Sequence, residues 1–167
     1  MNSKAILGIS IGSIALLAIL VVIGKPSNSA TSSPNPVASP NSTLKADEIN
    51  FDFGEISMTK GNVSHVFTVA NTGGEPVVVS KLYTSCMCTT ASIMNGTEKV
   101  GPFGMPGHSG IPSIKVSLAP GASTQVEAIF DPAAHGPAGV GTISRVVILE
   151  NSAGVPFKIG FTAKVIP

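Results

Sequence analysis

The sequence is poor in charged residues, in aromatic residues and in cysteine. Charged residues make up 11% of the 167 residues and aromatic residues 5%, and there are only two cysteines. Glycine and proline are plentiful, at 18 and 13. This composition favours a loop-rich, all-β domain over a helical one. Two cysteines cannot form the network of disulfides that stabilises many small secreted domains, so the domain must depend on a hydrophobic core.

Positive charge is scarce as well. The formal net charge is +1, and from Asp47 onward seven lysine and arginine residues are set against nine acidic residues. The sequence contains no stripe of basic residues. Proteins that bind nucleic acid carry such a stripe to neutralise the phosphates. We therefore predict no nucleic-acid partner.

The sequence signatures of common enzymes are missing too. The chain contains no G-x-S-x-G, no H-E-x-x-H, no P-loop and no dinucleotide-binding glycine pattern. Its acidic residues fall at strand ends and turns, where such side chains usually face water. We therefore predict that the protein is not an enzyme and that it has no catalytic residues.

A long hydrophobic run begins close to the amino terminus. Residues 5–24 contain no charged residue and lie between Lys4 and Lys25. Twenty residues rise about 30 Å as an α-helix, enough to cross the core of a bilayer. The run is longer than the apolar part of a cleaved signal peptide, and a poor cleavage site follows it. We predict that residues 1–25 are an uncleaved, single-pass membrane anchor and that the rest of the chain is extracytoplasmic.

Residues 26–46 are predicted to be a disordered tether. The segment consists mainly of Ser, Pro, Asn, Ala and Thr, with almost no bulky apolar residue. Such a segment cannot bury enough apolar surface to offset the entropy lost on ordering. Its prolines keep it semi-extended, so the tether would hold the following domain away from the membrane.

From Asp47 onward, apolar and polar residues alternate in short runs, which is the pattern of strands with one buried face. Turn signals such as Asn71-Thr72-Gly73-Gly74 separate the runs. The predicted strands are Ile49–Phe53, Val63–Ala70, Val77–Tyr83, Ser113–Leu118, Thr124–Phe130, Thr142–Leu149 and Val155–Val165. About seven short strands without helical periodicity predict an all-β, antiparallel β-sandwich over residues 47–167. Two segments rich in glycine and proline, residues 94–112 and 132–141, are predicted to be loops.

Cys86 and Cys88 follow the strand predicted for Val77–Tyr83 and have one residue, Met87, between them. On an extended segment, side chains two residues apart point to the same face, so both thiols would converge while Met87 faces away. Three states are then open. The thiolates can bind one soft metal ion, they can form a strained and easily reduced disulfide, or they can pack in the core as small apolar residues. A structural zinc site would require further cysteines.

The two loops carry further soft ligands. Met105 and His108 lie three residues apart in the first loop, and His135 lies in the second. Thioether, imidazole and thiolate together are a copper-like ligand set. The alternative is that Met105 fills the end of the sandwich and that the histidines face solvent. The candidate metal ligands are therefore Cys86, Cys88, Met105, His108 and His135, with copper as the metal.

Several short motifs follow one another in a fixed order. They are Phe51-Asp52-Phe53-Gly54, His65-Val66-Phe67, Asn71-Thr72-Gly73, Thr84-Ser85-Cys86-Met87-Cys88-Thr89-Thr90, Leu118-Ala119-Pro120-Gly121 and Phe130-Asp131-Pro132. In this order they resemble the bacterial domain-of-unknown-function family 1573. The resemblance implies a fold similar to the immunoglobulin-like domains of the Hydin type and an extracytoplasmic setting, and it implies no activity. The chain departs from the family in having Met87 where glycine is usual and in the long segment 94–112.

Two functions from different classes follow. The first is a membrane-anchored module that binds a soft metal, copper, through the cysteines and the Met105–His108 loop. The second is a structural or protein-interaction module of the cell envelope with an envelope protein as partner and no metal site. A thiol–disulfide component is less favoured, because the chain lacks a C-x-x-C motif on a thioredoxin-like βαβ pattern.

Overall fold

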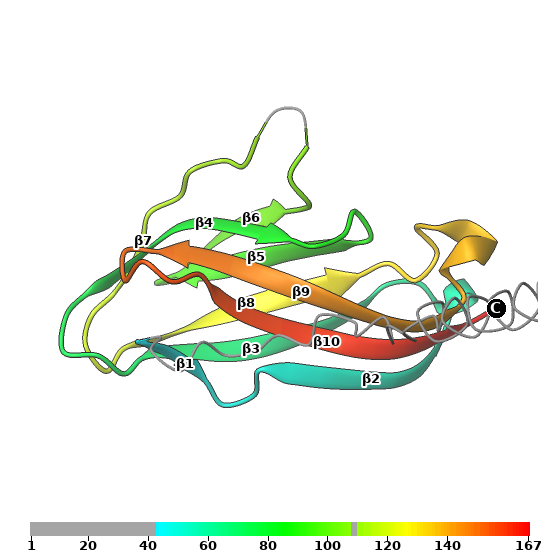
Figure 1. Ribbon diagram of the computed structural model, residues 1–167, viewed down its shortest axis with the longest axis horizontal. Helices are drawn as coiled ribbons and strands as arrows, with labels where there is room; N and C mark the ends of the chain where they lie inside the picture. Colours follow the sequence, from blue (N-terminus) through cyan, green and yellow to red (C-terminus); the bar gives the residue numbers. More distant parts are fainter. Residues whose placement is uncertain (1–42, 108–109) are drawn as a thin grey trace, which may run out of the picture. The chain divides into compact units, whose positions relative to one another are not determined.

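The computed structural model describes residues 43–107 and 110–167 (Figure 1). These residues form ten β-strands and two short 3-10 helices. In chain order, the elements are β1 (Leu44–Ala46), β2 (Asn50–Ser57), η1 (Met58–Lys60), β3 (Val63–Asn71), β4 (Val77–Thr84), β5 (Thr89–Asn95), β6 (Glu98–Phe103), β7 (Val116–Leu118), β8 (Ser123–Phe130), η2 (Gly136–Gly139), β9 (Gly141–Asn151) and β10 (Phe157–Ile166). The predicted all-β class is confirmed.

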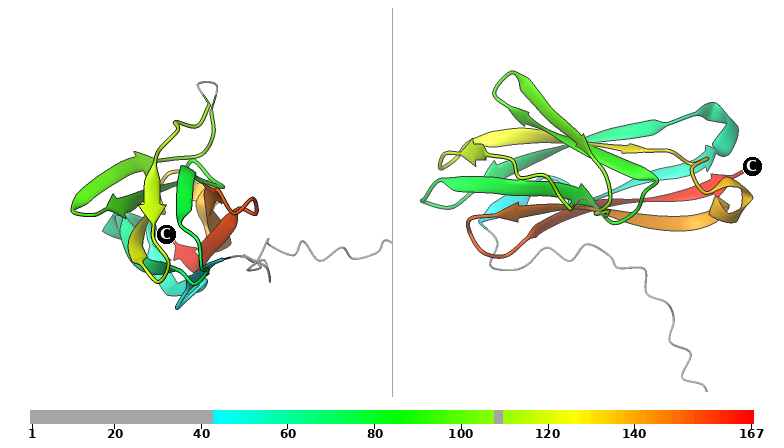
Figure 2. Two further views of the ribbon diagram at one scale, coloured as in Figure 1. Left: turned by 90° about the vertical axis from the view of Figure 1, so that its left-hand side faces the viewer. Right: turned by 90° about the horizontal axis from the view of Figure 1, so that it is seen from above.

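The strands form two five-stranded sheets that face each other (Figures 1 and 2). One sheet has the order β1-β3-β8-β5-β6 and the other has the order β2-β10-β9-β4-β7. The predicted sandwich is therefore confirmed, but the prediction of a wholly antiparallel one is wrong, because β2 pairs in parallel with β10. Side chains alternate between the two faces of a sheet whether neighbouring strands run parallel or antiparallel. The alternation in the sequence therefore cannot distinguish the two kinds of pairing.

The core lies between the sheets and is built from the alternating apolar positions of the strands. The side chains that are at most 1% exposed include Phe67, Val69, Val126, Ala128, Val147, Leu149, Ile159 and Phe161. Burying one large apolar side chain contributes about 1.5–3 kcal/mol. This core is the source of stability that a chain with two cysteines was predicted to need.

The sandwich begins before the predicted boundary at Asp47. Leu44 in β1 is 1% exposed and pairs with Asn71 of β3, so the last three residues of the predicted tether belong to the folded domain. A single apolar residue beside Lys45 and Ala46 is too short a run to show alternation. The predicted anchor and residues 26–42 of the predicted tether lie outside the described residues. Within the part of the chain that the structure describes, no helix is long and apolar enough to cross a membrane.

The segment predicted as one long loop, residues 94–112, contains strand β6. This strand pairs with β5 across a two-residue turn between Asn95 and Glu98, where Gly96 adopts a φ of 63°. Because β6 is the last strand of its sheet, it needs hydrogen bonds on one side only and can accommodate Pro102. Gly101 and Pro102 interrupt the alternation of apolar and polar residues in β6, so the sequence pattern did not predict this strand.

Two connections meet at one end of the sandwich, on the right in Figure 1. The turn between β4 and β5, residues 85–88, carries the chain from one sheet to the other. The connection from β8 to β9, residues 131–140, also crosses between the sheets. The first contains both cysteines and the second contains His135.

Candidate functional site: a disulfide between a histidine and an arginine

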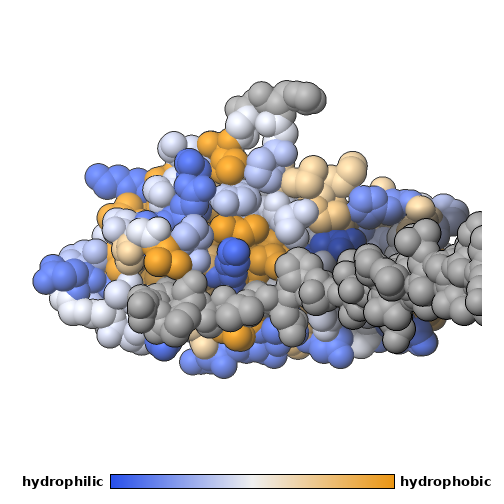
Figure 3. Space-filling model, in the orientation of Figure 1, coloured by the Kyte–Doolittle hydropathy of each residue, from blue (hydrophilic) through white to orange (hydrophobic). Residues whose placement is uncertain are grey.

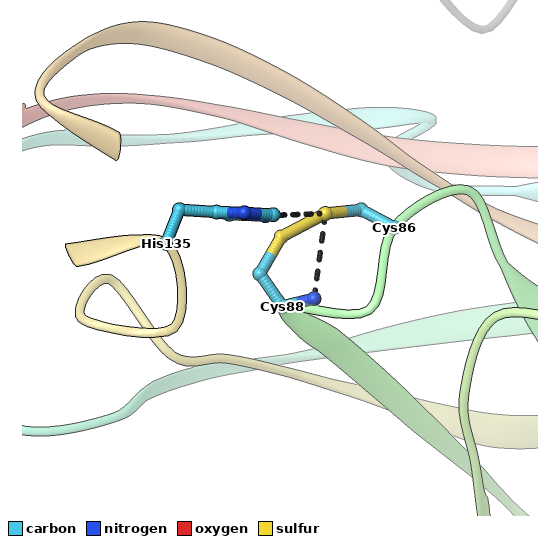
Figure 4. A group of neighbouring side chains, drawn as sticks. All are labelled: Cys86, Cys88 and His135. Carbon is cyan, nitrogen blue, oxygen red and sulfur yellow. Dashed lines mark hydrogen bonds between the residues drawn. A yellow bond between two sulfur atoms is a disulfide. The ribbon is translucent and has the colours of Figure 1, made fainter. Parts of the chain in front are cut away.

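Cys86 and Cys88 are joined by a disulfide in the turn between the sheets (Figure 4). Their Cα atoms are 5.3 Å apart. Hydrogen bonds shape this turn: the Thr84 hydroxyl lies 3.0 Å from the carbonyl of Cys86 and 2.8 Å from that of Thr89, and the Cys88 amide donates to Cys86 Sγ at 3.3 Å. The sulfurs converge as predicted, but they do so in a turn rather than on an extended strand.

Of the three states that the sequence left open, the structure shows the disulfide. The two sulfurs are nevertheless unequally accessible. Cys88 is 3% exposed and belongs to the hydrophobic core, whereas Cys86 is half-buried. Met87, between them, faces away from the pair as predicted and is 67% exposed. One sulfur is therefore accessible from outside while the other is enclosed.

His135 lies against the accessible sulfur, with Nε2 3.2 Å from Cys86 Sγ (Figure 4). The loop that carries it is attached to the cysteine turn, because the Asp131 amide donates to the Cys88 carbonyl at 2.9 Å. The Asp131 carboxylate then accepts from the Ala133 amide at 2.8 Å and turns the chain back. A disulfide sulfur has no proton, so the imidazole must be the donor, which places a hydrogen on Nε2.

Arg145 lies against the enclosed sulfur, and the sequence reasoning missed it. Its Nε donates to Cys88 Sγ at 3.1 Å and its Nη1 donates to the Ser144 carbonyl at 2.8 Å. Desolvation by burial lowers the pKa of Arg145, because it disfavours the charged guanidinium. Among the described residues, Arg145 takes part in none of the four ion pairs. Within the described part of the chain, this half-buried cation therefore faces a sulfur and has no carboxylate partner.

A signal for Arg145 was present in the sequence. It is the only arginine in the chain. It also shares its strand face with Val147 and Leu149, which are both fully buried, so it occupies an inward-facing position in the first half of β9. A charge at such a position must find a polar partner inside the domain.

Of the other two candidate ligands, only Met105 lies among the described residues, and no contact there brings it to the cysteines. Met105 is 49% exposed and lines a hollow together with Leu82, Phe103 and Pro112, and that lining includes neither cysteine nor His135. His108 lies outside the described residues.

The described residues thus bring together three of the five predicted ligands. One ligand atom each from Cys86, Cys88 and His135 lies within 4.8 Å of the others. In the oxidised form the two sulfurs are bonded to each other. After reduction, the same positions present two thiols and an imidazole at the end of a rigid sandwich, which is a set of soft ligands.

The solved structures with a similar fold do not identify an activity. A protein of unknown function from Porphyromonas gingivalis W83 aligns with a TM-score of 0.53 at 14% identity, over 73% of this chain and 46% of that one. A family 123 glycoside hydrolase from Clostridium perfringens aligns with a TM-score of 0.50 at 8% identity, over 75% of this chain and 27% of that one. The chain thus spans less than half of either protein, and identities this low show the fold alone.

The sequence comparisons point to one family. None of the curated proteins matches the chain significantly. Residues 44–104 match the model of the family described as "Protein of unknown function (DUF1573)". The matched region contains the cysteine motif and ends just after β6. This match confirms the predicted resemblance to the DUF1573 family over residues 44–104, which contain the first four of the six ordered motifs.

Proposed function

We propose that this domain is an envelope module that binds one soft metal ion, copper(I), when its two cysteines are reduced. The ligands are Cys86, Cys88 and His135. The observation that carries the proposal is the convergence of these three side chains within 4.8 Å. Thiolates are the ligands that select copper(I), and an imidazole completes a three-coordinate site. The module binds rather than catalyses, in keeping with the absence of enzyme motifs from the sequence.

The position of Arg145 supports two thiolates at this site. Two thiolates with one copper(I) ion carry a net charge of −1, which is unfavourable near a hydrophobic core. The guanidinium against Cys88 Sγ compensates this charge. The proposal rests on His135 rather than on Met105 and His108, because His135 is in contact with a cysteine sulfur.

The location of the module follows from the first part of the sequence. We propose that residues 5–24 anchor the chain in a membrane as a single span and that the sandwich is extracytoplasmic. The support is the length of this charge-free run. Alkaline extraction of isolated membranes tests the anchor: the protein should stay in the membrane fraction, and its release into the supernatant would contradict a spanning segment.

The metal proposal is tested by anaerobic titration of the full chain with copper(I) in detergent, after reduction with a phosphine and against a competing chelator. We expect one equivalent to bind, with both thiols required. Cys86→Ser and Cys88→Ser should abolish tight binding. His135→Ala should weaken it by at least about tenfold, since metal affinity depends strongly on a directly coordinating side chain.

The matched control is His65→Ala. His65 is half-buried, whereas His135 is exposed, and His65 stacks on Phe51 and pairs with Glu48 rather than contacting sulfur. This variant should bind copper(I) with wild-type affinity. If the reduced wild-type chain binds no copper(I), or if His65→Ala and His135→Ala weaken binding equally, the proposed site is wrong.

One observation favours the alternative of a structural or protein-interaction module. The disulfide closes the turn that joins the two sheets, and the described residues contain no free cysteine. On the part of the face in Figure 3 that grey atoms leave visible, apolar residues lie in separate patches among hydrophilic ones, which favours the structural form of this alternative over the protein-interaction form. A reduced protein that loses thermal stability and binds no metal would establish the structural role.

A further inference from the structure

The two sulfurs of the disulfide have different chemical surroundings. Cys86 Sγ is half-buried, beside the exposed ring of His135. Cys88 Sγ is enclosed, and two donors face it: the Arg145 guanidinium at 3.1 Å and the Thr89 hydroxyl at 3.7 Å. A thiol approaching from solvent therefore meets Cys86 first. The surroundings of Cys88 favour negative charge on its sulfur.

The guanidinium is the stronger of these two donors. A half-buried cation without a carboxylate partner costs desolvation energy that a neutral disulfide sulfur compensates only in part. A thiolate at the same position would compensate it better, because a hydrogen bond between two charged groups is about twice as strong as one between neutral groups. The site thus stabilises the product of opening the disulfide at Cys88.

We infer that the domain undergoes thiol–disulfide exchange with a dithiol substrate in a fixed order, with attack at Cys86 and release of Cys88. The incoming thiolate forms a bond to Cys86 Sγ. The bond between Cys86 and Cys88 breaks, and its electron pair leaves on Cys88 Sγ beside Arg145. Exchange is faster when the departing thiolate is more stable.

The second step completes the transfer. The other thiol of the substrate, after losing its proton to water, attacks the substrate sulfur that is bonded to Cys86. That bond breaks, and Cys86 leaves as a thiolate next to the Nε2–H of His135. The substrate dithiol has then lost two electrons and two protons and become a disulfide. The domain has gained two electrons and holds two thiolates. Each thiolate takes up one proton from water where its surroundings favour the thiol.

The order of attack can be mapped directly. The oxidised full chain, in detergent, is mixed with glutathione, quenched with N-ethylmaleimide and digested, and the cysteine peptide is sequenced by tandem mass spectrometry. We expect glutathione on Cys86 and maleimide on Cys88. Glutathione on Cys88, an even distribution between the two cysteines, or reaction only after unfolding would overturn the inference.

A kinetic measurement tests the role of Arg145. Reduction of the disulfide by dithiothreitol should be about 10- to 100-fold slower in Arg145→Met, the effect of losing a hydrogen bond to a charged group. Arg145→Lys should restore much of the rate, because it returns the positive charge. Lys81→Met is the matched control: Lys81 pairs with Glu150, and losing this charge should leave the rate unchanged.

Folding is monitored separately by thermal unfolding of each variant. A lower melting temperature with an unchanged rate would show that Arg145 is only structural and would contradict its role in exchange. If Arg145→Met does not fold, the mapping with wild-type protein still decides the order of attack. The inference concerns the oxidised form and does not depend on metal binding, which is measured after phosphine reduction, so either can fail while the other stands.

Discussion

Two connections rich in glycine and proline begin beside the cysteine turn and end in different places. The connection after β6 starts at Gly104, whose carbonyl accepts from the Thr84 amide at 3.2 Å. The connection after β8 starts at Asp131, whose amide donates to the Cys88 carbonyl at 2.9 Å. Among the described residues, only the second connection brings a candidate ligand, His135, to the disulfide.

The difference lies in the hydrogen bonds that follow. The Asp131 carboxylate accepts a hydrogen bond from the Ala133 amide and turns the chain back. His135, the residue before η2, then lies against Cys86 Sγ. After Gly104 the chain returns alongside β4, where Ile114 donates to the Ser80 carbonyl and β7 pairs with the beginning of β4. A loop that begins near a site contributes to it only if its local turn chemistry bends it back.

The largest expected effect comes from truncating the residues that precede the two connections. Phe130 is 2% exposed, contacts Phe161 and pairs with Thr89 at the start of β5. Phe130→Ala should lower the free energy of unfolding by about 3–5 kcal/mol, because it leaves a cavity in the core. Phe103→Ala, at the half-buried end of β6, should cost only about 1–2 kcal/mol. Urea denaturation of both variants measures the difference, and equal costs would contradict the inference that Phe130 is better packed than Phe103.

An intermediate effect is expected from adding a methyl group to one glycine in each connection. Gly136 has a φ of 55°, which an L-residue adopts only at a cost, so Gly136→Ala should destabilise the fold by about 1–2 kcal/mol. It should also displace His135 and weaken copper(I) binding.

The matched variant is Gly104→Ala. Gly104 is not among the glycines with positive φ, and a Cβ there would meet only the Thr89 carbonyl oxygen at 4.0 Å. Thermal unfolding should therefore show no loss of stability. A larger loss than in Gly136→Ala would show that the first connection is the more constrained one.

The smallest expected effect is on metal affinity. Met105→Ala should leave the copper(I) affinity of the reduced chain within about twofold of wild type, since Met105 lines a hollow apart from the three ligands and distant sites act independently. The same competition titration measures it. A tenfold loss would show that the thioether takes part in the site and would remove the contrast between the two connections.

Most of the strand pattern of this domain was accessible from sequence because apolar and polar residues alternate along those strands. Alternation in residues such as those of Val63–Ala70 and Thr124–Phe130 identified β3 and β8 almost to the residue. The central strand β5 was missed although four of its residues are buried, because two of the four, Thr89 and Ser92, are polar and no apolar–polar alternation results. The edge strands β1 and β6 were missed as well: β1 has a single buried residue and β6 has none. Their stability comes from pairing at the sheet edges, which leaves no hydrophobic period in the sequence.

The candidate site was predicted in part. Residue type and spacing singled out Cys86 and Cys88, and the same reasoning included His135. It also included Met105 and His108, because soft ligands on a glycine-rich loop look alike in sequence. Arg145 was missed, since its role depends on β9 lying next to β4, and no local pattern reports that neighbour.

The sequence by itself determined that this chain is an all-β sandwich with its chemistry at one cysteine pair, because alternation and residue type are local properties. Only the tertiary structure decided which groups flank that pair. The sheet order places Arg145 on the enclosed sulfur, and the turn after Phe130 places His135 on the accessible one. Both contacts join residues 49 or more positions apart in the chain, and such contacts arise from packing the two sheets together rather than from any short stretch of sequence.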